Sequence, residues 1–378
     1  MEIVVAKKDL LRLVARMQGV AERKSTMPVL SNVLLTVDGP NALRIAATDL
    51  YLAISGKVNA DVKKGGSVAV PAKDLLERVK MMPDGPVHVS TQDNSATTLK
   101  ASGSARRYTL RGMPGEEFPP LPQPAEGAAT LSLGVHVLST LIAKTHFSIS
   151  TDESRPHLNS ALFEWNGDVV RMVTTDGHRL SKLDAKVPGR QVSATMLIPL
   201  KAIHELRRLC DEMLSEKDKD APAEMSISQS GSSAFFQGGG TTFSVKLVDA
   251  QFPPYAQVIP QKTEKKVRVH RLAFADALRA VSVAASERTG GVKLSLGNKS
   301  MRISTESPES GDGSDEVPIE FSGPPMTIGF NAKYFLDVLG ALDGEDDIEL
   351  GLSGELDPAV LRPTSDLQFL AVVMPMRI

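Results

Sequence analysis

Residues 168–177 read DVVRMVTTDG and residues 41–50 read NALRIAATDL, so two distant stretches share a strand-like alternation that ends in Thr-Asp. Residues 300–306, SMRISTE, form a third and more divergent copy. The copies are separated by about a third of the 378-residue chain. A repeat this long indicates whole duplicated domains, because the units of a solenoid contain only a few dozen residues.

Each copy opens with a short apolar strand that leads into a helix, and these strands lie at 3–5, 131–133 and 267–269. Several short alternating segments and a second helical segment follow in each copy. This order predicts an α+β fold with antiparallel sheets and two helices in each of three similar tandem domains.

The first two copies also close alike, with Phe-Pro-Pro at 118–120 and at 252–254. Further prolines follow each of these segments, and such stretches are typical of linkers because proline interrupts regular structure. We therefore predict three domains, at 1–124, 125–261 and 262–378.

The first predicted helix separates apolar from basic side chains. Apolar residues recur at i, i+3, i+4 and i+7 from Leu10 to Met17, which is the pattern of a buried stripe. Basic residues recur on another face, at Lys8, Arg12 and Arg16. One such stripe is usually a solvated helix face, but several together attract DNA phosphates regardless of base sequence.

Acidic residues have a different distribution, since they gather in a Gly/Ser-rich segment at 306–316 and in a run at 343–347. We expect the first segment to be a loop. The near-neutral total of 43 Lys and Arg against 45 Asp and Glu therefore conceals local patches of opposite charge.

The overall composition is that of a soluble globular protein, with 42% hydrophobic and 23% charged residues. Cys210 is the only cysteine, which excludes an intrachain disulfide and a cysteine-based metal site. The sequence shows neither a secretory n-region and h-region nor an apolar run long enough for a membrane span, so we expect a cytoplasmic protein. Aromatic residues at 4% argue against a protein that stacks single-stranded bases.

Motifs for chemistry are scarce. The seven histidines have no metal-ligand spacing, and Gly238-Gly239-Gly240 lacks the Gly-Lys-Ser/Thr ending of a phosphate loop, so a hairpin turn is the better interpretation. No nucleophile elbow or dinucleotide fingerprint is present. We therefore expect no metal site.

The segment TTDGHRL at 174–180 allows two interpretations. Asp176 and His178 have the chemistry of an orienting carboxylate and a general base, so a hydrolase remains an alternative, although no partner motif accompanies them. The simpler interpretation is a hairpin turn between strands 169–175 and 179–185. The first copy keeps Thr48-Asp49 but lacks Gly-His-Arg, which favours a binding surface added to the middle domain.

The C-terminus also allows two interpretations, because a strand at 369–373 runs directly into MPMRI at 374–378. A frayed end is the simpler one. A docking surface is the other, since proline stiffens the tail and methionine offers adaptable apolar contact.

These features together resemble the bacterial DNA polymerase III beta subunit family, the sliding clamps of replication. The resemblance spans the chain and rests on the three copies, on TTDGHRL in the middle one and on VVMPMR at 372–377. The supporting segments are TMPVLSN at 26–32, SRPHLN at 154–159, KLVD at 246–249 with Phe252-Pro253, and IGFN at 328–331.

The resemblance implies a non-catalytic protein whose two copies join head to tail into a closed ring, with helices facing the hole and sheets outside. Duplex DNA would be held topologically, without base readout and without a cofactor. The implied partners are the DNA polymerase III alpha subunit, the clamp loader, and other polymerases and repair proteins that carry clamp-binding motifs. A repeat-built scaffold that does not bind DNA is a further alternative.

The resemblance also implies roles for particular residues. The implied DNA contacts are Lys24 and Arg155 on loops, with Arg12, Arg16, Arg78 and Arg208 on helix faces. The implied dimer interface contains Tyr108, Leu110, Val283 and Ala284, each of which is otherwise an ordinary core position.

The family's partner pocket lies between the middle and last domains and receives a short motif of glutamine, leucine and a leucine-phenylalanine pair. Carried over residue by residue, its wall would contain Leu158, Thr175, Gly177, His178, Arg179, Leu180, Pro253, Val258, Val372, Val373, Met374, Pro375, Met376 and Arg377. Two residues depart from the family pattern: Gln257 replaces a frequent arginine, and Ser160 replaces a common glycine.

Overall fold

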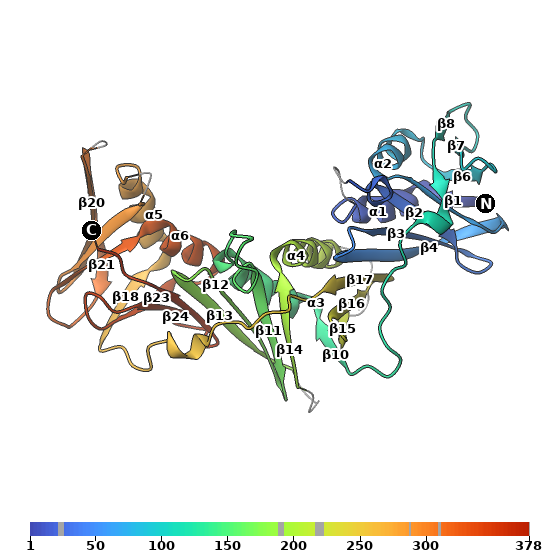
Figure 1. Ribbon diagram of the computed structural model, residues 1–378. Coiled ribbons are helices and arrows are strands. Elements are labelled where there is room, and N and C mark those ends of the chain that lie inside the picture. Colours follow the sequence, from blue (N-terminus) through green and yellow to red (C-terminus); the bar gives the residue numbers. More distant parts are fainter. Residues whose placement is uncertain (22–25, 188–192, 216–222, 287–288, 309–310, 378) are drawn as a thin grey trace. The chain divides into compact units, whose positions relative to one another are not determined.

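The computed structural model describes residues 1–21, 26–187, 193–215, 223–286, 289–308 and 311–377 (Figure 1). The chain forms two compact units. Unit 1 contains residues 1–136 and 204–247, and unit 2 contains residues 137–203 and 248–378. Helices α3 (Val135–Thr145) and α4 (Leu200–Ser215) each contain a boundary between the units.

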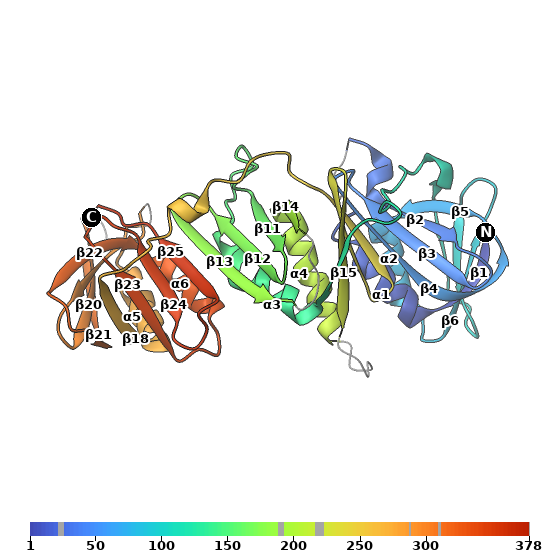
Figure 2. The same cartoon turned by 90° about the horizontal axis from the view of Figure 1, so that it is seen from below.

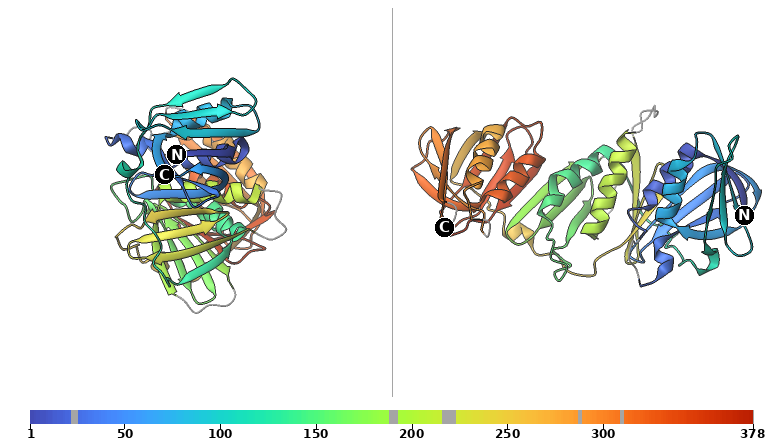
Figure 3. Two further views of the ribbon diagram at one scale, coloured as in Figure 1. Left: turned by 90° about the vertical axis from the view of Figure 1, so that its right-hand side faces the viewer. Right: turned by 90° about the horizontal axis from the view of Figure 1, so that it is seen from above.

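Unit 1 is built on one antiparallel sheet with the path β10-β15-β16-β17-β4-β1-β6-β7-β8, to which β2, β3, β5 and β9 pair off the path. Its helices are α1 (Lys7–Met17) and α2 (Ala72–Met81), which pack side by side (Figure 3). The strands are β1 (Glu2–Ala6), β2 (Asn32–Val37), β3 (Ala42–Thr48), β4 (Leu52–Lys64), β5 (Ser67–Pro71), β6 (Pro86–Thr91), β7 (Thr97–Ala101), β8 (Arg107–Leu110), β9 (Met113–Pro114), β10 (Thr130–Gly134), β15 (Glu224–Ser230), β16 (Ser233–Gly238) and β17 (Thr241–Lys246).

Helix α1 confirms the predicted apolar stripe, and of the three basic residues predicted for its other face it exposes Lys8 and Arg12 but not Arg16. Leu10, Leu13, Val14 and Met17 are all buried. Arg16 is buried as well, at 5% exposure, because its Nε donates to Glu212 Oε1 at 2.8 Å and its Nη1 donates to Thr241 Oγ1 at 2.9 Å. A buried guanidinium needs such partners, so Arg16 stabilises the interior of unit 1 and is not a surface cation.

Unit 2 contains a second antiparallel sheet, with the path β14-β11-β12-β13-β25-β24-β23-β18-β21-β20-β19-β22. Helices α5 (Arg271–Ser282) and α6 (Ala332–Ala341) pack side by side against its last-domain strands (Figures 1 and 2). The strands are β11 (Ser160–Asn166), β12 (Val169–Thr175), β13 (Arg179–Lys186), β14 (Ser193–Pro199), β18 (Lys265–His270), β19 (Gly291–Leu296), β20 (Ser300–Ser307), β21 (Gly311–Glu320), β22 (Met326–Asn331), β23 (Asp347–Leu352), β24 (Ala359–Pro363) and β25 (Phe369–Val373).

The sheets continue across the sequence copies. Strand β17 of the second copy pairs with β4 of the first, with Val245 opposite Leu52, and β25 of the third copy pairs with β13 of the second, with Val373 opposite Arg179. Because the backbone hydrogen bonds are shared, neighbouring copies are joined by strand pairing as well as by the segment that links them in sequence. The α+β class with antiparallel sheets is confirmed, since all strand pairs in the described residues are antiparallel.

Helix α6 buries the apolar stripe that its sequence predicts. Phe335, Val338, Leu339 and the following Leu342 are at most 1% exposed. The Phe335 ring meets Phe330 and Phe274 edge to face, with centroids 5.0 Å and 5.7 Å apart. This packing fixes the rotation of α6 and therefore which of its residues face outward.

The acidic segment at 306–316 is not the loop that its composition predicts. Most of it lies in the hairpin of β20 and β21, where Glu306 pairs with Asp312 and Ser307 pairs with Gly311. Residues 309–310 lie outside the described part of the chain. The loop prediction was wrong because ladder hydrogen bonds to β20 compensate for poor strand propensity, and propensity is a weak constraint when a partner strand is present.

Candidate functional site

The hairpin turn between β12 and β13 is held by its own side chains. Asp176 Oδ1 accepts hydrogen bonds from the backbone N–H groups of His178 and Arg179, at 2.9 Å and 3.0 Å. Thr175 Oγ1 donates to the carbonyl of Arg179 at 2.6 Å and accepts from the N–H of Gly177 at 3.1 Å. Gly177 has φ of 92°, a left-handed conformation that glycine adopts without steric cost. The predicted turn is confirmed, and its Thr-Asp pair is scaffold.

Arg179 joins this turn to two other elements. Its side chain is 8% exposed and reaches Asp176 at 3.1 Å and Asp337 of α6 at 2.6 Å. Its Nη2 donates to the carbonyl of Phe147, in the 3₁₀ turn His146–Ser148, at 2.6 Å. Three anchors from different parts of unit 2 therefore fix one planar guanidinium.

Tyr334 of α6 packs on two side chains of the turn, those of Arg179 and His178. The Arg179 guanidinium carbon lies 4.7 Å from the centre of the Tyr334 ring, and the His178 ring stacks on it at 6.3 Å with an interplanar angle of 14°. Burial, with a smaller contribution from the Asp176 charge, raises the pKa of the Tyr334 hydroxyl. Tyr334 thus stays neutral at physiological pH and offers an aromatic face with a polar tip.

The geometry does not support the alternative of a hydrolase. The Asp176 carboxylate is engaged by two backbone N–H groups and by Arg179, while His178 is exposed and packs on Tyr334. In the described residues no hydrogen bond joins the Asp176 carboxylate to the His178 imidazole. An orienting carboxylate must make that bond to hold a general base in position.

The C-terminal tail lies directly beside the turn. The Met374 N–H donates to the carbonyl of His178 at 2.9 Å, and the Met376 N–H donates to the carbonyl of Gly329 at 2.9 Å. Met374, Pro375 and Met376 are half-buried. Backbone bonds therefore hold the tail on two sides, and the simpler interpretation, a frayed end, does not fit residues 374–376.

A linker segment is anchored against the same part of the sheet. Phe252 joins a buried cluster that contains Leu180 and Val372, and Tyr255 packs against this cluster. The Tyr255 hydroxyl donates to Glu164 at 2.8 Å and accepts from Arg171 at 2.9 Å.

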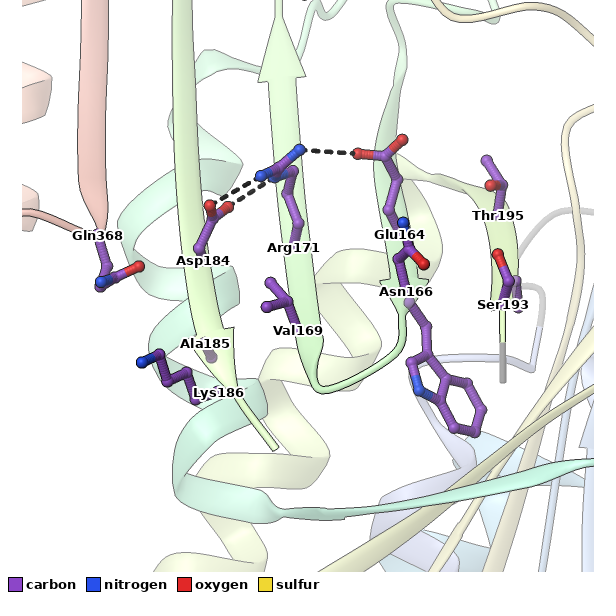
Figure 4. Close-up of a pocket in the computed structure, with 12 residues that line it drawn as sticks. Glu164, Asn166, Val169, Arg171, Asp184, Ala185, Lys186, Ser193, Thr195 and Gln368 are labelled. Carbon is purple, nitrogen blue, oxygen red and sulfur yellow. Dashed lines mark hydrogen bonds and ion pairs between the residues drawn. The ribbon is translucent and has the colours of Figure 1, made fainter. Parts of the chain in front are cut away.

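Arg171 lies between two carboxylates on the face of β11, β12 and β13 (Figure 4). It binds Asp184 through two nitrogens, at 2.6 Å and 2.8 Å, and its ion pair with Glu164 measures 3.7 Å. Burial opposes ionisation of Asp184, but hydrogen bonds from Arg171 and Lys182 outweigh it and lower the pKa of Asp184. This network fixes Tyr255, and with it the linker that carries Pro253 and Val258.

The predicted pocket residues divide into two groups in unit 2. Six of them are buried: Leu158, Thr175, Arg179, Leu180, Val372 and Val373. The others are exposed or half-buried: Gly177, His178, Pro253, Val258, Met374, Pro375, Met376 and Arg377. Sequence reasoning missed Tyr334 and Asp337. The helix pattern could have identified both as residues on the outward face, because they fall between the apolar positions of the predicted last helix.

Most of the predicted DNA contacts are paired with acidic residues. Arg12, Arg78, Arg155 and Arg208 are all partly exposed, and their carboxylate partners are Asp9, Asp74, Asp152 and Glu205, respectively. Arg16 is buried, as described above, and Lys24 lies outside the described residues. Paired arginines remain able to exchange carboxylate for phosphate, whereas a buried one cannot do so without unfolding.

The predicted interface residues differ in exposure. Tyr108 is half-buried on β8, which ends the strand path of unit 1, and Leu110 is 1% exposed. In unit 2, Val283 is 86% exposed and Ala284 is half-buried. The alternative of a core position therefore fits Leu110 and does not fit Val283.

The described residues contain neither a metal-binding cluster nor a membrane-spanning helix. No group of three or more His, Cys, Asp or Glu side chains is arranged to hold a metal ion there. None of the helices in those ranges is both long and apolar enough to cross a membrane.

These observations define a repeat-built binding protein in which a turn, a tail and a linker meet on one unit. Three family models match the chain: the N-terminal, central and C-terminal domains of the DNA polymerase III beta subunit, at residues 1–122, 132–254 and 256–377. The chain belongs to the DNA polymerase III beta subunit family, and its function is that of a sliding clamp in DNA replication.

The similarity extends over whole chains. The beta sliding clamp of Pseudomonas aeruginosa is 34% identical over 381 residues, and that of Pseudomonas putida is 32% identical over 380 residues, each with 100% of both chains covered. The crystal structure of the Pseudomonas aeruginosa subunit aligns with a TM-score of 0.92 at 32% identity and full coverage of both chains. The Thermotoga maritima subunit aligns with a TM-score of 0.90 at 26% identity, covering 100% of this chain and 99% of that one.

Proposed function

We propose that this chain is the processivity clamp that tethers a replicative DNA polymerase through a peptide site formed by the 175–180 turn and the C-terminal tail. The observation that carries this proposal is the hydrogen bond from the Met374 N–H to the His178 carbonyl, which joins the two sequence-distant segments. Met374, Pro375 and Met376 are half-buried apolar residues beside this bond, and the exposed His178 and Arg377 add polar groups. Such a surface suits a short apolar motif whose direction is fixed by a few polar contacts.

A direct test deletes Met374–Ile378 and measures the affinity of a fluorescein-labelled Gln-Leu-Asp-Leu-Phe peptide by anisotropy. We expect the peptide affinity to fall at least tenfold, because the deletion removes Met374, Pro375 and Met376 while β25 stays paired with β13. Leu356→Ala is a suitable control, since Leu356 is a 66% exposed apolar residue that belongs to neither the turn nor the tail. Equal affinities for the deleted and intact proteins would contradict the peptide-site assignment.

We further propose that the chain encircles duplex DNA as a head-to-tail homodimer. Tyr108 on β8 and the exposed Val283 support this, because an unpaired strand edge and an exposed apolar residue are both stabilised by a second copy. Arg12, Arg78, Arg155 and Arg208 would contact phosphates through exchangeable bonds, which permits sliding without base recognition.

The remaining roles follow from this mode of action. The chain itself performs no catalysis and holds no cofactor, and a separate ATP-driven clamp loader opens the ring. The DNA polymerase III alpha subunit, other polymerases and repair proteins with clamp-binding motifs would compete for the tail site. Function on the bacterial chromosome places the protein in the cytoplasm.

The topological part of this proposal has its own test. The protein is loaded on nicked circular DNA with a bacterial clamp loader and ATP, washed in high salt, and assayed before and after linearisation. Retention on the circle and release from the linear form are expected, because salt weakens phosphate contacts but not a topological link. Failure of retention with a validated loader would refute the clamp mechanism, and retention on both forms would indicate direct tight binding.

A further inference from the structure

The turn of the first sequence copy repeats the hydrogen bonds that the Thr Oγ1 and Asp Oδ1 atoms make in the 175–179 turn. Thr48 Oγ1 donates to the carbonyl of Leu52 at 2.8 Å and accepts from the Leu50 N–H at 3.0 Å. Asp49 Oδ1 accepts from the N–H groups of Tyr51 and Leu52, at 2.9 Å and 2.6 Å. Leu50 and Tyr51 therefore occupy the places that Gly177 and His178 occupy in the second copy.

The neighbouring strand repeats as well. The Lys246 N–H donates to the carbonyl of Tyr51 at 2.8 Å, as the Met374 N–H donates to the carbonyl of His178 at 2.9 Å. In both cases the donor directly follows the residue that pairs with the first residue of the hairpin's second strand, Val245 opposite Leu52 and Val373 opposite Arg179. Unit 1 therefore contains the same junction of turn and departing strand that carries the peptide site in unit 2.

The side chains at this junction are exposed and apolar. Leu50 is 52% exposed and Tyr51 is 66% exposed. Leu50 has φ of 75°, a conformation that a bulky residue adopts only at a steric cost, and Gly177 shows that the turn needs no side chain at this place. Solvation does not explain an exposed leucine held in this conformation, but contact with a partner does.

Charge at the junction indicates the chemistry of that partner. The Lys246 ammonium lies 5.5 Å from the centre of the Tyr51 ring and, among the described residues, forms no ion pair. A carboxylate is the complement of this ammonium, and an apolar side chain is the complement of Leu50 and Tyr51. Leu50 carries a side chain at the place where the second copy has Gly177, so the two junctions present different surfaces and we expect different affinities.

We propose that Leu50, Tyr51 and Lys246 form a second docking site, for a short peptide segment that carries an acidic side chain next to an apolar one. This inference rests on the proposed function, because the 175–179 turn with the tail is the reference site. A second, weaker site on the same chain lets one partner hold the clamp by two contacts, so that its effective local concentration stays high when either contact opens.

The test uses the full chain and a photo-reactive, fluorescein-labelled Gln-Leu-Asp-Leu-Phe peptide. After deletion of Met374–Ile378, we expect residual binding at least tenfold weaker than in the intact protein, with cross-links to 48–52 or 246. Leu50→Gly combined with Tyr51→Ala, or Lys246→Glu alone, should weaken the residual binding at least a further tenfold. Leu50→Gly is expected to fold, because glycine suits φ of 75°. Met81→Ala is the control, since Met81 is 59% exposed in the same unit.

The outcomes separate the two proposals. Complete loss of peptide binding after the tail deletion would overturn the proposal of a second site and would agree with the proposal of the tail site. Residual binding that the Leu50, Tyr51 and Lys246 variants do not change would also overturn it. Full binding after the tail deletion would instead contradict the proposed function. If the same variants shorten retention on DNA and leave residual peptide binding unchanged, the surface contacts DNA and the peptide inference is wrong.

Discussion

Replacing Asp337 with alanine removes the carboxylate through which α6 holds Arg179. The two groups are 2.6 Å apart, and their side chains are 31% and 8% exposed. Breaking a fully buried ion pair costs about 3–5 kcal/mol because a charge is left unpaired. Arg179 keeps Asp176 and the Phe147 carbonyl, and Asp337 is partly solvated, so we expect a smaller loss of about 1–2 kcal/mol in the unfolding free energy of unit 2.

Urea unfolding followed by tryptophan fluorescence measures this loss. Trp165 is the only tryptophan, lies on β11 and is 3% exposed, so its emission reports unit 2. Asp343→Ala is the matched control, because Asp343 is 93% exposed and its partner Arg271 also bonds two backbone carbonyls. We expect the control to cost at most about 0.5 kcal/mol.

The same variant should weaken binding at the proposed peptide site. Tyr334 and Asp337 are three residues apart and lie on the same face of α6. Without the bond between Arg179 and Asp337, this face is held less firmly against the turn, and so is the Tyr334 ring on which His178 stacks. We expect Asp337→Ala to bind the Gln-Leu-Asp-Leu-Phe peptide several-fold more weakly and Asp337→Asn to be intermediate, because its amide oxygen still accepts a hydrogen bond. If Asp337→Ala and Asp343→Ala behave alike in both assays, Arg179 does not connect the turn to α6.

Three shorter predictions concern other groups. Burial, with a smaller contribution from the Asp211 charge, raises the pKa of the Cys210 thiol to about 12, so alkylation at pH 8 should be slow until urea unfolds the protein; rapid modification of the native state would contradict this. The pKa of Asp184 is lowered in the folded state, so its ionised carboxylate stabilises the fold above about pH 4, and this stabilisation is lost as the pH falls through the folded-state pKa. Asp184→Asn should therefore flatten the dependence of the unfolding free energy on pH below about pH 4. An unchanged slope in urea unfolding would refute this. Arg12→Glu should shorten retention on circular DNA at low salt, with the difference from the unsubstituted protein disappearing at high salt; a salt-independent difference would indicate a structural effect.

Local sequence patterns determined most of the secondary structure. The apolar stripes of α1 and α6, the strands that open each copy, the turn at Asp176-Gly177 and the glycine turn before β17 all follow from periodicities and turn residues within a few positions of each other. The threefold repeat predicted the tandem organisation for the same reason, since each copy carries its own pattern.

The tertiary structure alone decided which of these patterns meet. Arg16 has the spacing of a surface residue but is buried, because Glu212 and Thr241 from distant segments supply its partners. The segment at 306–316 has the composition of a loop but forms a hairpin, because β20 supplies the ladder bonds. The tail joins the turn through one backbone bond, and the contacts of Arg179 with Asp337 and Tyr334 span more than 150 residues of sequence. Such pairings depend on sheet register and helix rotation, which packing of the whole domain sets and no local pattern encodes.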